Sequence, residues 1–150
     1  MRDNVNGGDL TEVTFLRLKA TQQDEIYHLC AKRSGLPDAQ FWLLYAICET
    51  EDALCQNAFC ESWYYSKQTA SAAVAALEKA GLVYLTYAEG PRKQKELHLT
   101  EKGQQFCDKH IRSVQTVEGQ VLKKLSERDR DDFFRIYTKI LCTLEQELNV

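Results

Sequence analysis

Five polar side chains that can bind nucleic-acid bases lie within six positions of the chain: Ser66, Lys67, Gln68, Thr69 and Ser71. A glutamine amide pairs bidentately with adenine, a lysine ammonium binds guanine or a phosphate, and a serine hydroxyl serves a base or the backbone. Ser66 precedes an alanine-rich run and is a suitable N-cap. The pattern predicts a helix whose first turn carries these groups to DNA.

A second group of cations lies at Arg92, Lys93 and Lys95, in the segment AEGPRKQK, which also contains a Gly-Pro pair typical of turns. Basic side chains at the tip of a turn suit the narrow minor groove, whose negative potential attracts them without base-specific bonds. The formal charge of the 150-residue chain is −3. Contact with DNA must therefore depend on local patches and not on overall positive charge.

The chain contains six cysteines, Cys30, Cys48, Cys55, Cys60, Cys107 and Cys142. The N-terminus lacks an apolar secretory segment, and no apolar run is long enough to span a membrane, so we expect a cytoplasmic protein with reduced thiols. Most of the cysteines are expected to be small buried residues. Cys55 is the candidate redox-sensing thiol, because it stands at a predicted helix start, where the helix dipole favours a thiolate.

Four residues could in principle meet at a zinc ion: His28 and Cys30 on one predicted helix, and Cys107 and His110 on another. Their spacing is not a recognised zinc signature. The alternative is that the cysteines pack in the core and the histidines lie at the surface or in hydrogen bonds. We predict no metal site and no cofactor.

Enzyme signatures are missing from the sequence. It contains no nucleophile elbow, no phosphate-binding glycine loop and no plausible pair of catalytic carboxylates. Several aromatic residues are candidates for a pocket that takes a flat ligand, although such a set more often belongs to a core: Tyr27, Trp42, Tyr45, Trp63, Tyr64 and Tyr65. A thiol-dependent enzyme is only a remote alternative.

Apolar periodicity predicts the elements that position these groups. A helix of about 20 residues should end at Gly35, and a buried helix should follow with Asp38 as its N-cap. A short helix with Phe59, Cys60 and Trp63 inward leads through a tight turn to the helix after Ser66, whose inner stripe is Thr69, Ala73, Val74 and Leu77. Alternation over 83–88 and 96–100 predicts a hairpin. A helix-turn-helix followed by a basic hairpin is a winged helix.

Two further helices follow the predicted hairpin. Thr100 is a candidate cap for a long helix with apolar residues from Cys107 to Leu125, and Ser126 for a last helix. The last helix carries a continuous apolar stripe: Phe133, Tyr137, Ile140, Leu144 and Leu148. Because a small winged helix cannot cover so much apolar surface, we expect the first and last helices to pack on a second copy. The fold class is mostly α (α+β), a winged helix-turn-helix with flanking N- and C-terminal dimerisation helices.

The chain resembles the MarR family of bacterial transcriptional regulators over nearly its whole length. LPDAQFWLLYAI is similar to the family's entry to its second helix, and CQNAFCESWYYSKQTASAAVAALEKAGLV to its helix-turn-helix with the Leu-Glu-x-x-Gly-Leu ending. LHLTEKG is similar to its strand-to-helix junction. The chain departs from the pattern at Cys55, at Pro91, and at Ala72, Ala75 and Ala76, where the family often has arginine or lysine.

The resemblance implies a homodimer in which residues 1–35 and 104–150 dimerise and residues 36–103 form the DNA-binding region, all within a single intertwined domain. It also implies a repressor of a palindromic double-stranded operator, released by a small, often aromatic ligand, by cysteine oxidation or by metal binding. The alternative is a winged-helix protein-interaction module that does not bind DNA, which the alanine-rich helix favours and the basic hairpin opposes.

Overall fold

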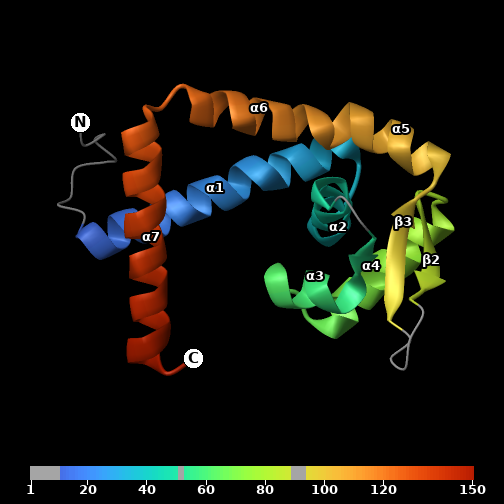
Figure 1. Cartoon of the computed structure of the whole chain (residues 1–150), viewed down its shortest axis with the longest axis horizontal. Helices are drawn as coiled ribbons and strands as arrows, with labels where there is room; N and C mark the ends of the chain where they lie inside the picture. The colour runs from blue at the N-terminus through green and yellow to red at the C-terminus, as the bar shows by residue number, and fades with distance from the viewer. Residues whose placement is uncertain (1–10, 51–52, 89–93) are drawn as a thin grey trace. The chain divides into compact units, whose positions relative to one another are not determined.

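The computed structural model describes residues 11–50, 53–88 and 94–150. The chain divides into two compact units, residues 1–111 and 112–150. The described elements of the first unit are α1 (Glu12–Ser34), α2 (Asp38–Glu49), β1 (Leu54–Cys55), α3 (Gln56–Ser62), α4 (Lys67–Lys79), β2 (Val83–Tyr87), β3 (Lys95–Leu99) and α5 (Glu101–His110). The second unit contains α6 (Arg112–Lys123) and α7 (Glu127–Leu148) (Figure 1). Within the described residues, no helix combines the length and the apolar character needed to cross a membrane.

The first two helices meet at Gly35, where the prediction of a helix end is confirmed. Gly35 has φ 79°, a left-handed conformation that costs glycine little, and its N–H donates to the carbonyl of Lys32. The prediction of Asp38 as N-cap is wrong. Pro37 occupies that position, and the Asp38 carboxylate instead binds Nδ1 of His28 at 2.9 Å. His28 on α1 therefore binds the Asp38 carboxylate that was predicted to cap α2.

The core of the first unit lies around α2, as the apolar run in that segment predicts. Its large, fully buried side chains come from α2, α3, α4, β3 and α5, and from the residue that follows α5: Phe41, Leu43, Leu44, Phe59, Leu77, Leu97, Cys107 and Ile111. Burying one such aliphatic or aromatic side chain stabilises the fold by about 1.5–3 kcal/mol. These contacts fix the positions of α3 and α4, which carry the candidate site.

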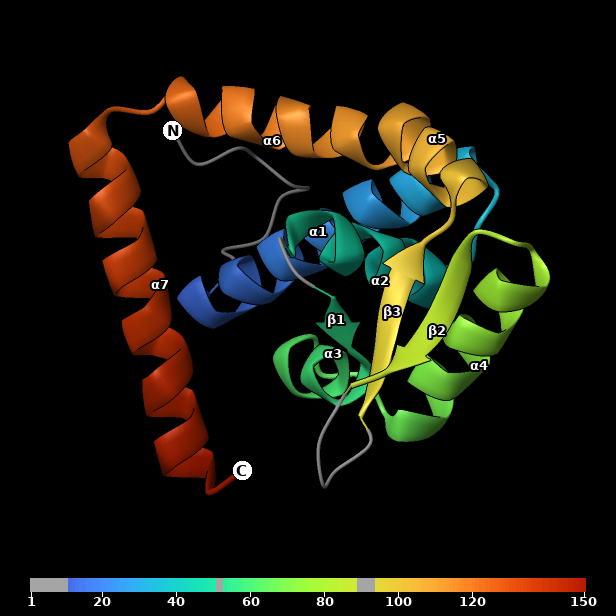
Figure 2. The ribbon, with the colours of Figure 1, turned by 45° about the vertical axis from the view of Figure 1, so that its right-hand side comes forward.

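The wing is a three-stranded antiparallel sheet in the order β1-β3-β2. The predicted hairpin is confirmed, with Val83 opposite Leu99 and Tyr87 opposite Lys95. The strand β1 was not expected, since its two residues are too few to show a period. Leu54 pairs with Leu97 of β3, so the short strand depends on a partner distant in sequence. Figure 2 shows β3 between the other two strands.

The predicted long helix after Thr100 is interrupted. Thr100 does cap α5, since its Oγ1 accepts from the N–H of Gly103 at 2.9 Å, but α5 ends at His110. Ile111, with φ −99°, is fully buried, and α6 begins at the next residue. In the second unit, Ser126 caps α7 as expected, accepting from the N–H of Asp129 at 3.1 Å. Neither α6 nor α7 contains a buried residue.

Candidate nucleic-acid interface

The first turn of α4 is held by a local cap. Ser66 Oγ accepts from the N–H of Thr69 at 3.1 Å and lies 2.8 Å from Thr69 Oγ1. These two hydroxyls are therefore engaged with each other. The exposed side chains of Lys67 and Gln68 extend from the same turn, at the end of the helix where the dipole favours an anion.

The two faces of α4 differ in exposure. The buried face consists of Ala70, Ala73, Val74 and Leu77, so the prediction of Thr69 on the inner stripe is wrong and Ala70 takes its place. The opposite face is exposed and contains all the candidate residues of this helix together with two alanines: Ser66, Lys67, Gln68, Thr69, Ser71, Ala72 and Ala75. The middle of this face, at Ala72 and Ala75, is thus narrow as well as uncharged.

A contact between α3 and α4 reaches one of the candidate residues. Gln56, the first residue of α3, donates from Nε2 to Ser71 Oγ at 2.8 Å. Gln56 is not among the residues predicted from the sequence, because its importance depends on the packing of α3 against α4. Its position at the start of the first helix of a helix-turn-helix is the one signal that could have suggested it.

Three contacts fix the C-terminal end of α4 to the start of α5. Thr100 Oγ1 donates to the carbonyl of Gly81 at 2.6 Å, and Lys102 Nζ donates to the carbonyl of Ala80 at 2.6 Å. The helix α5 also approaches the chain closely at Gly103, where a Cβ would overlap the carbonyl oxygen of Leu82. Together they fix the orientation of α4 with respect to the wing.

Part of the predicted basic wing can be placed. Lys95 is exposed at the first position of β3, opposite Tyr87. Arg92 and Lys93 lie outside the described residues. The first turn of α4 and the start of β3 lie at the lower end of the first unit in both Figure 1 and Figure 2.

One face of the wing sheet carries a polar network. The ring of His98 stacks on Tyr84 with centroids 5.0 Å apart, and its Nε2 lies 2.7 Å from Thr86 Oγ1. Glu96 Oε2 is 4.0 Å from the same nitrogen. Cross-strand pairs of this kind stabilise an antiparallel sheet. The network stabilises the pairing of β2 with β3, the strand that carries Lys95.

The candidate redox thiol, Cys55, is half-buried on β1. Its Sγ donates to Gln94 Oε1 at 3.5 Å, and its backbone pairs with Glu96. The thiol provides no side-chain cap for α3, in agreement with its poor capping chemistry. All six cysteines are free thiols in the structure, but the expectation that most of them are buried is wrong. Only Cys107 is buried, Cys142 is exposed, and the other four are half-buried.

The residues of the zinc alternative do not come together. Across the described ranges of the chain, no group of three or more His, Cys, Asp or Glu side chains is arranged to hold a metal ion. His28 binds Asp38, as stated above. His110 packs on Phe106 with ring centroids 4.6 Å apart, and burial, with a smaller effect of Lys109, lowers its pKa below the usual value.

Most of the candidate pocket aromatics pack directly on one another. Trp42 lies 4.8 Å from Tyr27, 5.2 Å from Tyr45 and 5.2 Å from Trp63 between ring centroids. Burial, and then the charge of Asp38, raise the pKa of the Tyr65 phenol. Tyr64 differs from the others, because it is 87% exposed in the turn between α3 and α4, with φ 55°. The cluster joins α1, α2 and the C-cap of α3.

Comparisons with known proteins agree with this geometry. Residues 34–94 match the family model described as the MarR family. No curated protein matches the sequence.

Solved structures share the fold over most of their length. NMB1585, a MarR family regulator from Neisseria meningitidis, is 21% identical with a TM-score of 0.79, covering 93% of this chain and 98% of that one. The S. aureus MepR-DNA complex is 19% identical with a TM-score of 0.70, covering 91% and 99%. The transcription regulator MarR from Oenococcus oeni PSU-1 is 16% identical with a TM-score of 0.68, covering 85% and 96%. At these identities the likeness shows a common fold.

Proposed function

Because residues 34–94 match the MarR family model and the fold is that of MarR family regulators, we propose that the chain is a DNA-binding regulator of this family, a homodimeric repressor of a palindromic operator. Members of this family act by binding DNA and not by catalysis, so the chain is not an enzyme. The observation that carries the proposal is the exposed, capped first turn of α4. Lys67 and Gln68 extend from it at the same end of the unit as Lys95.

The contacts with DNA divide between α4 and the wing. Gln68 pairs with a base, with adenine as the matching partner, and Lys67 binds guanine or a phosphate. Ser66 and Thr69 hold the helix end, whose N–H groups suit a phosphate. The wing places its cations, Arg92, Lys93 and Lys95, in the minor groove. Residues 36–103 are thus the DNA-binding region.

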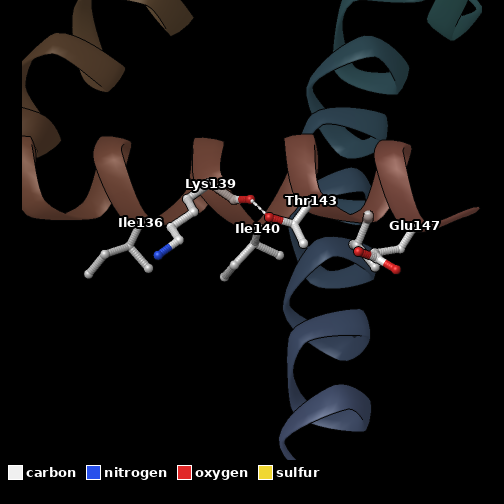
Figure 3. Close-up of a pocket in the computed structure, with 6 residues that line it drawn as sticks. Ile136, Lys139, Ile140, Thr143 and Glu147 are labelled. Atoms are coloured by element: carbon white, nitrogen blue, oxygen red, sulfur yellow. Dashed lines mark hydrogen bonds between the residues drawn. The ribbon is translucent and has the colours of Figure 1, made fainter.

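Dimerisation uses the flanking segments, residues 1–35 and 104–150. The exposed apolar face of α7 supports this assignment, since Ile136 is 49% and Leu144 46% exposed. Figure 3 shows the hollow on this face, lined by Ile136, Lys139, Ile140, Thr143, Leu144 and Glu147. On α1, Val13, Phe15 and Leu18 are exposed as well. A second copy covers these surfaces and places two α4 helices on successive half-sites.

Selection from a random duplex pool tests the function directly. The full-length protein is expected to enrich a palindrome with half-sites about one helical turn apart. Binding isotherms at several salt concentrations should then show a steep decline in affinity, because each phosphate contact contributes about 0.9 to the logarithmic slope. Absence of enrichment at every salt concentration contradicts the proposal and favours the protein-interaction module, for which the exposed alanines Ala72 and Ala75 are the supporting feature.

Two variants separate base reading from phosphate attraction. Gln68→Ala is expected to relax the preference at one base position, with a loss of about 1–3 kcal/mol on the preferred operator. Arg92→Ala combined with Lys93→Ala should instead weaken binding to every duplex and reduce the salt slope. The assignment of α4 as the reading helix is wrong if the selected sequence of Gln68→Ala equals that of the unmodified protein.

Release from DNA is proposed to follow binding of a small aromatic ligand or oxidation of a thiol. The aromatic cluster of α1, α2 and α3 supports the first route, and the half-buried Cys55 beside the helix-turn-helix supports the second. Repeating the operator isotherm with a mild oxidant distinguishes them. An unchanged isotherm rejects thiol release, and a loss of binding that persists in Cys55→Ser rejects Cys55 as the sensor.

A further inference from the structure

The hydrogen bond between Gln56 and Ser71 has a direction. The Gln56 amide nitrogen Nε2 donates, and Ser71 Oγ accepts, at 2.8 Å. A serine hydroxyl has one proton to donate and two lone pairs that accept. The bond with Gln56 occupies one of those lone pairs and leaves the proton and the other lone pair available.

The Ser71 proton has no partner inside the described part of the fold. Hydroxyls on other helices donate to the carbonyl four residues earlier: Thr21 to Arg17, Thr116 to Arg112 and Thr143 to Lys139. Such back-bonding is common for helical serine and threonine. Ser71 differs, because among the described residues its one hydrogen bond is the one it accepts from Gln56. Its proton is therefore available to a partner on the exposed side of α4.

We propose that Gln56 is a positioning residue that fixes Ser71 as a hydrogen-bond donor toward DNA, and that this polarity sets base specificity at one position. The proposal rests on the proposed DNA-reading function of α4. In the major groove, guanine, adenine and thymine each present an acceptor, whereas cytosine presents only the N4 amino donor. Accepting from Gln56 polarises the Ser71 hydroxyl toward donation, so Ser71 favours guanine, adenine or thymine over cytosine.

The narrow outer face of α4 makes this contact possible for so short a side chain. Ala72 and Ala75, both exposed, follow Ser71 on the side of the helix opposite the core. Side chains of this size allow the helix axis to approach the base edges closely. Where the family often has a long basic side chain, this chain has room for a serine hydroxyl to reach a base.

The test compares the sequences selected from one random duplex pool by four full-length proteins. These are the unmodified chain, Ser71→Ala, Gln56→Met and Gln56→Glu. Methionine has a similar length but forms no such bond. Glutamate has nearly the same shape but only accepts, so Ser71 would donate to it and turn its lone pairs to the DNA. The unmodified protein should exclude cytosine at one position of each half-site, by about two- to tenfold, as expected for one hydrogen bond.

The variants should change the base preference at that position of the half-site and leave the preferences at the other positions unchanged. Ser71→Ala and Gln56→Met should lose the exclusion of cytosine, while Gln56→Glu should favour cytosine or adenine, whose amino groups donate. A purely structural role of Gln56 would lower affinity for all sequences without altering this preference. Thermal unfolding of each variant identifies any that fails to fold. If Gln56→Glu fails to fold, the comparison of Ser71→Ala and Gln56→Met, each as a single variant, still decides the matter.

Failure of the inference differs from failure of the proposed function. If the unmodified protein enriches a palindrome but Ser71→Ala and both Gln56 variants select the same bases, Gln56 does not set specificity. If the unmodified protein prefers cytosine at the position that responds to Ser71→Ala, the polarity is opposite to the one inferred. If it enriches no sequence, both the inference and the proposed function are wrong.

Discussion

A chain carrying Ile140→Glu and Leu144→Glu is expected to be monomeric and to bind operator DNA about 10²- to 10⁴-fold more weakly than the unmodified protein. Both residues line the apolar hollow of α7, and neither α6 nor α7 has a buried residue within its own unit. If a second copy covers that face, each glutamate places a charge in an apolar interface, which costs several kcal/mol. The monomer then loses the simultaneous binding of two half-sites. Sedimentation and operator isotherms measure the two effects.

The matched control puts the same two charges on the opposite side of α7. Thr138→Glu with Gln146→Glu changes the net charge equally, at exposed positions that do not line the hollow. This variant should remain dimeric, with only a modest loss of DNA affinity through charge repulsion. A dimer that survives Ile140→Glu with Leu144→Glu would contradict the assignment of α7 to the interface.

Gly103→Ala is expected to destabilise the protein by about 3 kcal/mol, near the upper end of the usual cost of overpacking. Alanine would otherwise favour a helix at this position. Its Cβ, however, would overlap the carbonyl oxygen of Leu82, and that group is backbone that cannot rotate away. Either the backbone at Leu82, just before β2, or the helix α5 must shift. This shift also disturbs the hydrogen bond from Thr100 to the carbonyl of Gly81. Urea unfolding should show a lower midpoint with an unchanged slope.

Gly119 provides the control for this prediction. It also lies inside a helix, α6, but a Cβ built there meets no atom within 4 Å. Gly119→Ala should therefore stabilise the protein, by up to about 1 kcal/mol. Both variants must be compared at one protein concentration, because the stability of a dimer depends on it. Equal effects of the two substitutions would show that the close approach at Gly103 is unimportant.

Local sequence signals predicted the helix starts well. Ser66, Thr100 and Ser126 cap their helices through the N–H three residues later, and this bond needs no distant partner. The hairpin of β2 and β3 was likewise predictable, because alternation along each strand and a short connection specify the pairing. The same local rules placed Lys67, Gln68 and Ser71 on the exposed side of α4, but they also assigned Thr69 to the buried stripe, which was wrong. Their contacts with DNA stay predictions.

Contacts between distant segments were beyond such rules. The strand β1 exists because Leu54 pairs with Leu97, and Asp38 leaves its expected cap because His28 on α1 binds it. The helix predicted from Thr100 to about residue 125 ends where Ile111 enters the core. In each case packing or pairing with a distant residue outweighs a local preference, which is worth about 1 kcal/mol.

The sequence by itself determined the caps at Ser66, Thr100 and Ser126, the hairpin and the polar first turn of α4, because each depends on residues within a few positions of one another. Only the tertiary structure decided how that turn is supported. It joins Gln56 to Ser71 across two helices and brings Gly103 against Leu82, and so controls the direction of one hydroxyl and the position of α4. Which residue donates and which accepts in a hydrogen bond between two helices depends on the atoms that packing brings together. The periodicity of the sequence does not predict this.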